Sequence, residues 1–180
     1  MKKILLIIIL LQSLIIVKGQ ELFGDKDESW SSNKHKLEIY YSAPWEIVSA
    51  ADESDKVFIG LMCENAKMGY SVEINLNPRM DSLTNNEYYD YTKNYLLSQD
   101  KNNKLISDGH ILFQGKNFYQ QIFVFHNKKW GLQKMHEIVK RKKGYIIAIN
   151  FFYSVEKNNI NENAIPLEIV EINEELRIFD

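Results

Sequence analysis

The sequence predicts an α+β fold in which an antiparallel β-sheet with a long meander is flanked by helices on both faces. The first observation is a series of strongly β-prone runs of about ten residues between residues 105 and 153. Three short turns separate these runs, at residues 114–117, 127–129 and 142–144. Short turns between adjacent β-prone runs are typical of an antiparallel meander.

The second observation is that both faces of this meander are apolar when the hairpins are paired symmetrically about their turns. One face carries Ile111, Phe113, Phe118, Ile122, Val124, Leu132, Ile138, Ile147, Ile149 and Phe151, and the other carries Leu112, Tyr119, Phe123, Phe125, Met135, Val139, Ile146, Ala148 and Phe152. An antiparallel sheet with one face in water shows an alternation of apolar and polar residues instead. Helices are therefore expected on both faces, which gives a three-layer α/β/α sandwich.

Two segments supply these helices. Thr84 and Glu87 fit a capping box, so a helix is expected to begin at Thr84 and to run to about Gln99. A second helix is expected from about Pro166, a residue suited to the first helical turn, to Leu176.

The chain before the first helix is expected to form the remaining strands. Strands are predicted at residues 37–41, 57–63 and 70–76, because these runs are β-prone and partly alternating. A turn is predicted at Ala43-Pro44-Trp45, and residues 49–56 are interpreted as a polar connection.

The N-terminus has the features of a secretion signal. A positive start at residues 1–3 precedes an apolar run over residues 4–17, and cleavage is expected after Gly19. A membrane-spanning helix needs about 20 apolar residues, so this shorter run favours a cleaved signal peptide over an uncleaved anchor, the alternative. The protein is therefore expected to be exported, either to the periplasm or out of the cell.

The sequence therefore predicts three parts of the chain. Residues 1–19 are the signal peptide. Residues 20–36 are polar and charged without periodicity, which predicts a flexible leader with regular structure beginning near Leu37. Residues 37–180 are expected to form a single domain.

Composition limits the classes of function. Without residues 1–19 the chain has 19 basic residues against 24 acidic ones, a net charge of −5. This charge argues against binding of nucleic acid, which needs a basic surface. The single cysteine, Cys63, cannot form an internal disulfide, and its apolar neighbours predict a buried thiol.

The sequence contains no nucleophile elbow, phosphate loop, zinc-protease motif or cysteine pair, so no catalytic residue and no cofactor is predicted. The four histidines are His35, His110, His126 and His136. In the predicted register His110 and His136 lie on opposite faces, His126 lies at a turn and His35 in the leader. Metal ligands must converge on one point, so no metal site is expected.

Five side chains are candidates for contacts with a ligand or a partner. His136 and Gln120 are predicted to lie opposite each other on a mostly apolar face. They form either a buried hydrogen-bonded pair, the favoured interpretation, or the polar floor of a ligand site. Tyr88, Tyr91 and Tyr95 give the first helix an aromatic face, which is more often core than a platform for a ligand.

Several fold-building features resemble those of the PsbP and Mog superfamily. They are Tyr41-Ser42-Ala43-Pro44-Trp45-Glu46-Ile47, the helix around Glu87-Tyr88, the hairpin Gln114-Gly115-Lys116 before the meander, and the closing helix followed by Arg177-Ile178-Phe179 as a packed tail. The superfamily includes the extrinsic photosystem II subunit, a nuclear-transport factor that binds a small GTPase, and exported bacterial proteins such as DcrB. The resemblance covers most of residues 37–180. It implies a sheet between helices and a role in binding macromolecules, with no shared catalytic residue.

The leading functional hypothesis is an exported, non-catalytic interaction module whose partner is another protein of the cell envelope or exterior. No stable membrane insertion is expected after cleavage of the signal peptide. Two alternatives remain: a carrier of a small apolar ligand in a pocket between sheet and helix, and an enzyme whose site is built from dispersed residues.

Overall fold

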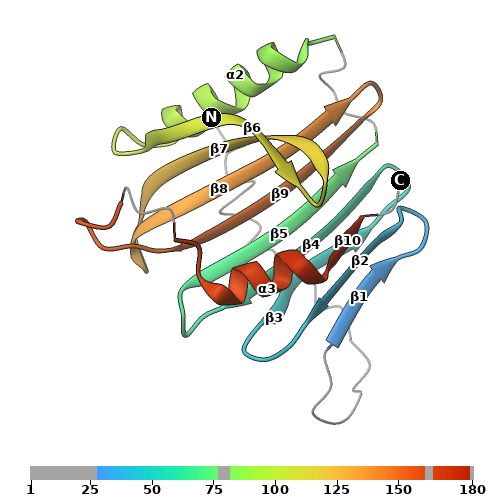
Figure 1. Cartoon of the computed structure of the whole chain (residues 1–180), viewed down its shortest axis with the longest axis horizontal. Helices are drawn as coiled ribbons and strands as arrows, with labels where there is room; N and C mark the ends of the chain where they lie inside the picture. Colours follow the sequence, from blue (N-terminus) through green and yellow to red (C-terminus); the bar gives the residue numbers. More distant parts are fainter. Residues whose placement is uncertain (1–27, 77–81, 161–163, 179–180) are drawn as a thin grey trace.

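The computed structural model of the chain describes residues 28–76, 82–160 and 164–178. Its centre is a seven-stranded antiparallel sheet with the strand order β3-β4-β5-β9-β8-β7-β6 (Figure 1). The strands are β3 (Glu46–Asp52), β4 (Lys56–Cys63), β5 (Met68–Asn75), β6 (Lys104–Phe113), β7 (Lys116–Asn127), β8 (Gly131–Lys142) and β9 (Tyr145–Ser154). Strands β6 to β9 follow one another in space as they do in the chain, so the predicted meander is confirmed.

A smaller sheet of three strands has the order β1-β2-β10. It consists of β1 (Glu28–Ser32), β2 (Leu37–Tyr41) and β10 (Leu176–Ile178). Strand β10 takes the place of the predicted tail, of which Phe179 lies outside the described residues.

Strand β1 corrects the prediction that regular structure begins near Leu37. Trp30 pairs with Ile39, and the whole of β1 is antiparallel to β2. The edge of β2 provides the backbone partners for a polar segment that has little strand propensity of its own, so tertiary context decides its structure. The predicted signal peptide and residues 20–27 of the predicted leader lie outside the described residues.

The two helices of the described residues pack on opposite faces of the large sheet, as predicted. Helix α2 (Asn85–Gln99) begins after Thr84, and the predicted capping box with Glu87 is present. Its Tyr89 packs with Val139 and Ile146. Helix α3 (Leu167–Glu175) and the small sheet cover the other face, so the α/β/α arrangement is confirmed with a small sheet added to one layer.

The main core lies between the large sheet and the layer of α3 and the small sheet. It includes Ile59, Val72, Ile149 and Phe151 from the large sheet, with Ile169 from α3. The observed pairing follows the predicted faces, since cross-strand partners share a face.

The predicted polar connection at residues 49–56 is largely strand, which corrects that prediction. Strand β3 runs to Asp52 and pairs with β4 up to Val57. Small and polar side chains at an edge strand leave no clear pattern in the sequence.

The predicted buried thiol of Cys63 is confirmed. Within the described residues, no helix has the length and apolar character needed to cross a membrane.

Candidate functional site

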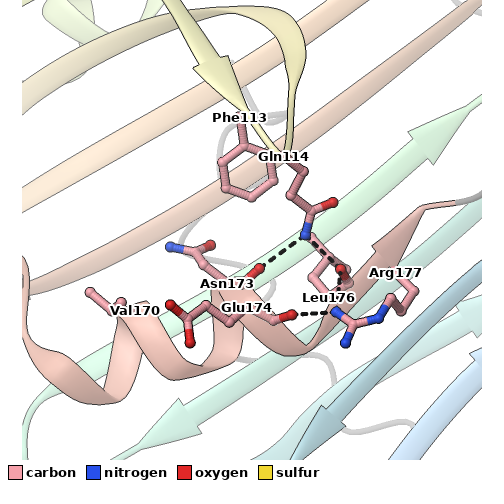
Figure 2. Close-up of a pocket in the computed structure, with 7 residues that line it drawn as sticks. All are labelled: Phe113, Gln114, Val170, Asn173, Glu174, Leu176 and Arg177. Carbon is pink, nitrogen blue, oxygen red and sulfur yellow. Dashed lines mark hydrogen bonds between the residues drawn. The ribbon is translucent and has the colours of Figure 1, made fainter.

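The C-terminal end of α3 and the tip of the β6–β7 hairpin enclose a surface groove of about 400 Å³ (Figure 2). Its lining consists of Phe113, Gln114, Val170, Asn173, Glu174, Leu176 and Arg177. The apolar part comes from Phe113, Val170 and Leu176. Glu174 and Arg177 are exposed and place opposite charges at the rim, so the groove opens to solvent.

Gln114 fastens the hairpin tip to the end of α3. Gln114 and Gly115 have φ angles of 50° and 71°, as in a two-residue turn with two positive φ values. The Gln114 Nε2 atom donates to the carbonyl oxygens of Asn173, at 3.0 Å, and Leu176, at 2.6 Å. Carbonyls at the end of a helix have no donor within the helix, so Gln114 satisfies two of them from another element.

Lys116 adds a third hydrogen bond between the hairpin tip and the C-terminal segment, this one to β10. Its Nζ atom donates to the carbonyl oxygen of Ile178 at 3.2 Å. Leu176 and Ile178 are alternate residues of β10, an edge strand of the small sheet. Side chains of the hairpin tip therefore donate hydrogen bonds to two carbonyl oxygens of this edge, those of Leu176 and Ile178.

Asn173 joins the groove to the core. The buried Tyr70 hydroxyl donates to Asn173 Oδ1 at 2.7 Å. Burial raises the pKa of Tyr70, so the hydroxyl stays protonated and acts as a donor. Asn173, which lines the groove, is thus fixed by two hydrogen bonds. Its side chain accepts one from Tyr70, and its backbone carbonyl accepts the other from Gln114.

Gln120 and His136 are in contact as predicted, away from the groove, but they lie diagonally rather than opposite each other, since His136 pairs with Ile122 and Gln120 with Ile138. Gln120 Nε2 is 3.1 Å from His136 Nδ1, and His136 Nε2 is 3.2 Å from the Tyr153 hydroxyl, which donates to the carbonyl of Ala164. The imidazole also stacks on Phe151, with 4.6 Å between ring centres. Burial is the main cause that lowers the pKa of His136 to about 4, so the ring is neutral and both of its nitrogens have partners.

The tyrosines of α2 do not form the predicted buried face. The buried tyrosine is Tyr89, whose ring stacks on Tyr119 with 4.0 Å between centres. Tyr91 is 47% exposed and stacks on Tyr95, and both Tyr95 and Tyr88 are half-buried. The predicted face, with Tyr88, Tyr91 and Tyr95, and the face that contains Tyr89 both fit the spacing of a helix. The spacing alone therefore does not show which face is buried.

The face that packs is selected by the sheet beneath α2. The buried Gln121 amide donates to the carbonyl oxygen of Tyr89 at 2.8 Å. This bond fixes the rotation of the helix in addition to the stacking of Tyr89 on Tyr119.

The histidines do not converge. His110 pairs with Tyr119 on the face opposite His136, as predicted. Within residues 28–76, 82–160 and 164–178, no three histidine, cysteine, aspartate or glutamate side chains are grouped to hold a metal ion.

His35 is buried, which corrects its predicted place in a flexible leader. Its Nε2 atom lies 2.7 Å from the carbonyl oxygen of Glu53 and 3.5 Å from Asp52 Oδ1. The Ser32 hydroxyl donates to the same Asp52 oxygen at 2.9 Å. Serine, histidine and aspartate meet here, but the hydroxyl binds the carboxylate rather than the imidazole. The link between nucleophile and base that a catalytic triad needs is therefore not formed.

Sequence reasoning missed the groove. Gln114 and Asn173 are 59 positions apart, and no local pattern connects them. The available signal was a glutamine at a turn position with positive φ, where asparagine, aspartate or glycine is usual.

The chain matches no protein-family model and no curated protein. It is similar to two solved structures over most of their length. The cyanobacterial PsbP (CyanoP) of Synechocystis sp. PCC 6803 has a TM-score of 0.55 and 13% identity, covering 91% of this chain and 99% of that one. The Ran-binding protein Mog1p of Saccharomyces cerevisiae has a TM-score of 0.50 and 10% identity, covering 87% and 97%. With its sheet order, two helical layers and closing strand, the chain has the PsbP/Mog-like fold.

Proposed function

We propose that this protein is an exported, non-catalytic interaction module that binds another protein through the groove between α3 and the β6–β7 hairpin. The observation that carries the proposal is the groove itself, which has an apolar floor and an exposed rim with both signs of charge. Protein interfaces have this anatomy, with an apolar centre and a polar border.

The shape of the groove favours a protruding partner side chain over an enclosed small molecule. Sites for small molecules bury most of the ligand surface. Three of the seven lining residues, Gln114, Glu174 and Arg177, are exposed, so a small ligand here would stay largely in contact with water.

The rim charges are exposed to a partner, although the Arg177 guanidinium also donates to the carbonyl oxygens of Glu174 and Leu176 (Figure 2). Glu174 and Arg177 are exposed, and the Arg177 guanidinium lies 3.7 Å from the carboxylate of Glu175 on the surface. Exposed ion pairs contribute little to stability, so a partner can replace this one at low cost. One protein with this fold, yeast Mog1p, is a Ran-binding protein, and this supports a binding role.

Export is proposed from the sequence of residues 1–19, with its positive start and short apolar run. The partner would then be a protein of the cell envelope or exterior. The mass of the exported protein tests this step: the mass of residues 20–180 is expected, whereas an intact N-terminus would contradict cleavage after Gly19.

Site-specific photo-crosslinking tests the groove. A photoreactive amino acid in place of Val170, in the groove, is expected to give one dominant protein adduct in cells. The matched control is Leu167, which lies on the same helix outside the groove and is 67% exposed. Val170→Glu is then expected to weaken binding of the identified partner by about tenfold or more, and Leu167→Glu to leave it unchanged.

Two results would contradict the proposal. The first is an equal pattern of adducts from positions 170 and 167. The second is a co-purifying apolar small molecule that Val170→Glu displaces, which would establish the carrier alternative.

A further inference from the structure

Edge strands expose unpaired backbone groups to which another strand can add, and proteins protect most edges against this. Among the described residues, β3 and β6 end the large sheet, and β1 and β10 end the small one. These edges differ in their protection.

Two of the edges carry visible protection. At β10 the side chains of Gln114 and Lys116 occupy the carbonyls of Leu176 and Ile178. Strand β6 contains the charged residues Lys104 and Asp108 and a register shift between Leu105 and Ser107, and α2 contacts this strand. Charges, irregular backbone and a covering element are the usual devices against strand addition.

Strand β3 has its charged residues at its two ends, Glu46 and Asp52, and the β1–β2 turn contacts the second end, where Ser32 bonds Asp52 and His35 bonds the carbonyl of Glu53. Between these ends its side chains are small or apolar. Its sequence, Glu-Ile-Val-Ser-Ala-Ala-Asp, has no lysine, arginine or proline. Ile47 and Val48 are each 39% exposed, and the following residues Ser49 to Ala51 are small. A register shift between Ile47 and Ser49 interrupts the start of β3, as a similar shift does in β6, and residues 49–52 then pair regularly with β4.

The pairing with β4 shows which backbone groups of β3 face outward. The amide of Glu53 donates to the carbonyl oxygen of Lys56 at 2.8 Å, so Glu53 is bonded inward. In an antiparallel pair, inward and outward residues alternate. The N–H and C=O groups of Asp52 and Ala50 therefore point away from β4.

Charge distinguishes between possible occupants of this edge. Glu46 at the start of β3 and Asp52, Glu53 and Asp55 at its end are all exposed acids. A second copy added antiparallel about Ser49 would place Glu46 opposite Asp52, and like charges opposite each other are unfavourable. A segment with basic residues at its ends would be attracted instead.

We propose that β3 is a docking edge to which an extended segment of a partner protein adds as a further strand, basic at its ends and rich in β-branched or apolar residues between them. The main-chain bonds of Ala50 and Asp52 hold the segment, and Ile47 and Val48 contact its side chains. This surface is separate from the groove at α3, and its existence does not depend on the function proposed for that groove.

A library of random nine-residue peptides displayed on phage provides the probe. Enriched peptides are synthesised, and their affinity for the purified protein is measured by fluorescence anisotropy. We expect enriched sequences with basic ends, and NMR amide shifts concentrated at residues 49–52 of β3.

Ala50→Pro is the main test variant, because it removes an outward N–H and leaves the bonds to β4 in place. Binding of the enriched peptides is expected to fall by about tenfold or more. Ala50→Ser retains the N–H and is expected to bind like the wild type. Val48→Lys is a second variant, placing a positive charge where the basic segment docks, and is expected to weaken binding even if Ala50→Pro does not fold.

Several outcomes would overturn the proposal. These are no enrichment of peptides, equal binding to the wild type and to folded Ala50→Pro or Val48→Lys, and equal binding of a peptide whose basic ends are changed to glutamate. A dimer detected by light scattering that Ala50→Pro abolishes would assign the edge to a second copy. Val170→Glu should leave peptide binding unchanged, which separates this test from that of the groove.

Discussion

His136 and Glu137 are neighbours in β8, and their side chains point to opposite faces of the sheet. Burial lowers the pKa of His136 to about 4, with a smaller contribution from the charge of Lys134. Burial raises the pKa of Glu137 to about 7, and a hydrogen bond from Thr92 opposes this shift. Two adjacent residues are therefore held neutral for the same physical reason, with opposite consequences for the pH dependence of stability.

The sign of each effect follows from which state binds the proton. As the pH falls from 6.5 to 4, His136 takes up a proton in the unfolded state but not in the folded state, so the free energy of unfolding falls. As the pH falls from 7 to 4.5, Glu137 takes up a proton in the folded state but not in the unfolded state, so the free energy of unfolding rises. Each shift spans about 2.5 pH units, or at most about 3 kcal/mol.

We therefore expect the two contributions to cancel between pH 4.5 and 6.5. Glu137→Gln should make the free energy of unfolding fall with decreasing pH, relative to the wild type, and His136→Gln should make it rise. Urea denaturation at pH 4.5, 5.5 and 6.5 measures both differences. Curves for the two variants that run parallel to that of the wild type would contradict the burial of both groups.

At the scale of elements, the hairpin tip and the α3–β10 segment depend on each other. Gln114 spans the contact by donating to two carbonyls that the helix itself leaves without donors. These hydrogen bonds hold one wall of the groove in place. If they are weakened, the hairpin tip and α3 are expected to move relative to each other, and the shape of the groove to vary.

Gln114→Asn separates this contact from the turn itself. Asparagine tolerates positive φ, and Asn-Gly is a favoured turn sequence, but the shorter side chain cannot reach both carbonyls. A local loss of about 1 kcal/mol is expected. Hydrogen exchange should become faster at the end of α3 and in β10, and stay unchanged in the strands β6 and β7.

Asn117→Ala is the control for this variant, because Asn117 is exposed in the same hairpin. Equal exchange in both variants would show that Gln114 does not hold α3. Faster exchange throughout β6 and β7 after Gln114→Asn would show that the turn had been disturbed instead.

Elements with a strong local signal were predicted well. The capping box of Thr84 set the start of α2, and the turns at Gly115 and Gly144, both with positive φ, set the register of the meander. The predicted register placed His136 opposite Gln120, whereas in the structure His136 is opposite Ile122 and Gln120 is opposite Ile138. The turn predicted at residues 127–129 was centred one residue too early, because Asn127 pairs with Gly131. The two side chains still share a face and meet diagonally, so their contact could be predicted but their exact pairing could not.

Features that depend on packing between distant segments could not be predicted. Strand β1 forms because β2 presents an edge, and Tyr89 rather than Tyr88 is buried because Gln121 and Tyr119 select that face. The groove depends on how α3 lies against a hairpin tip far away in the sequence. None of these contacts leaves a local pattern of residues.

At the scale of the whole molecule, the two layers that cover the large sheet differ in size. The layer of α3 and the small sheet shares a continuous core with the sheet, to which Ile169, Ile172 and Leu176 belong. The layer of α2 is attached through a small cluster in which Tyr89 is the buried residue of the helix. We therefore expect α3 to unfold with the sheet, and α2 to open separately at lower free energy.

Paired substitutions test this difference. Ile169→Ala is expected to lower the global free energy of unfolding by about 3 kcal/mol, because it leaves a cavity in the main core. Tyr89→Ala should have a smaller global effect and should instead abolish the exchange protection of α2 amides, while those of β8 and β9 remain protected. Tyr91→Ala, on the exposed side of the same helix, should change neither quantity. If Tyr89→Ala destabilises β8 and β9 as much as Ile169→Ala does, then α2 belongs to the global unfolding unit, and the small area of its contact is not what limits its stability.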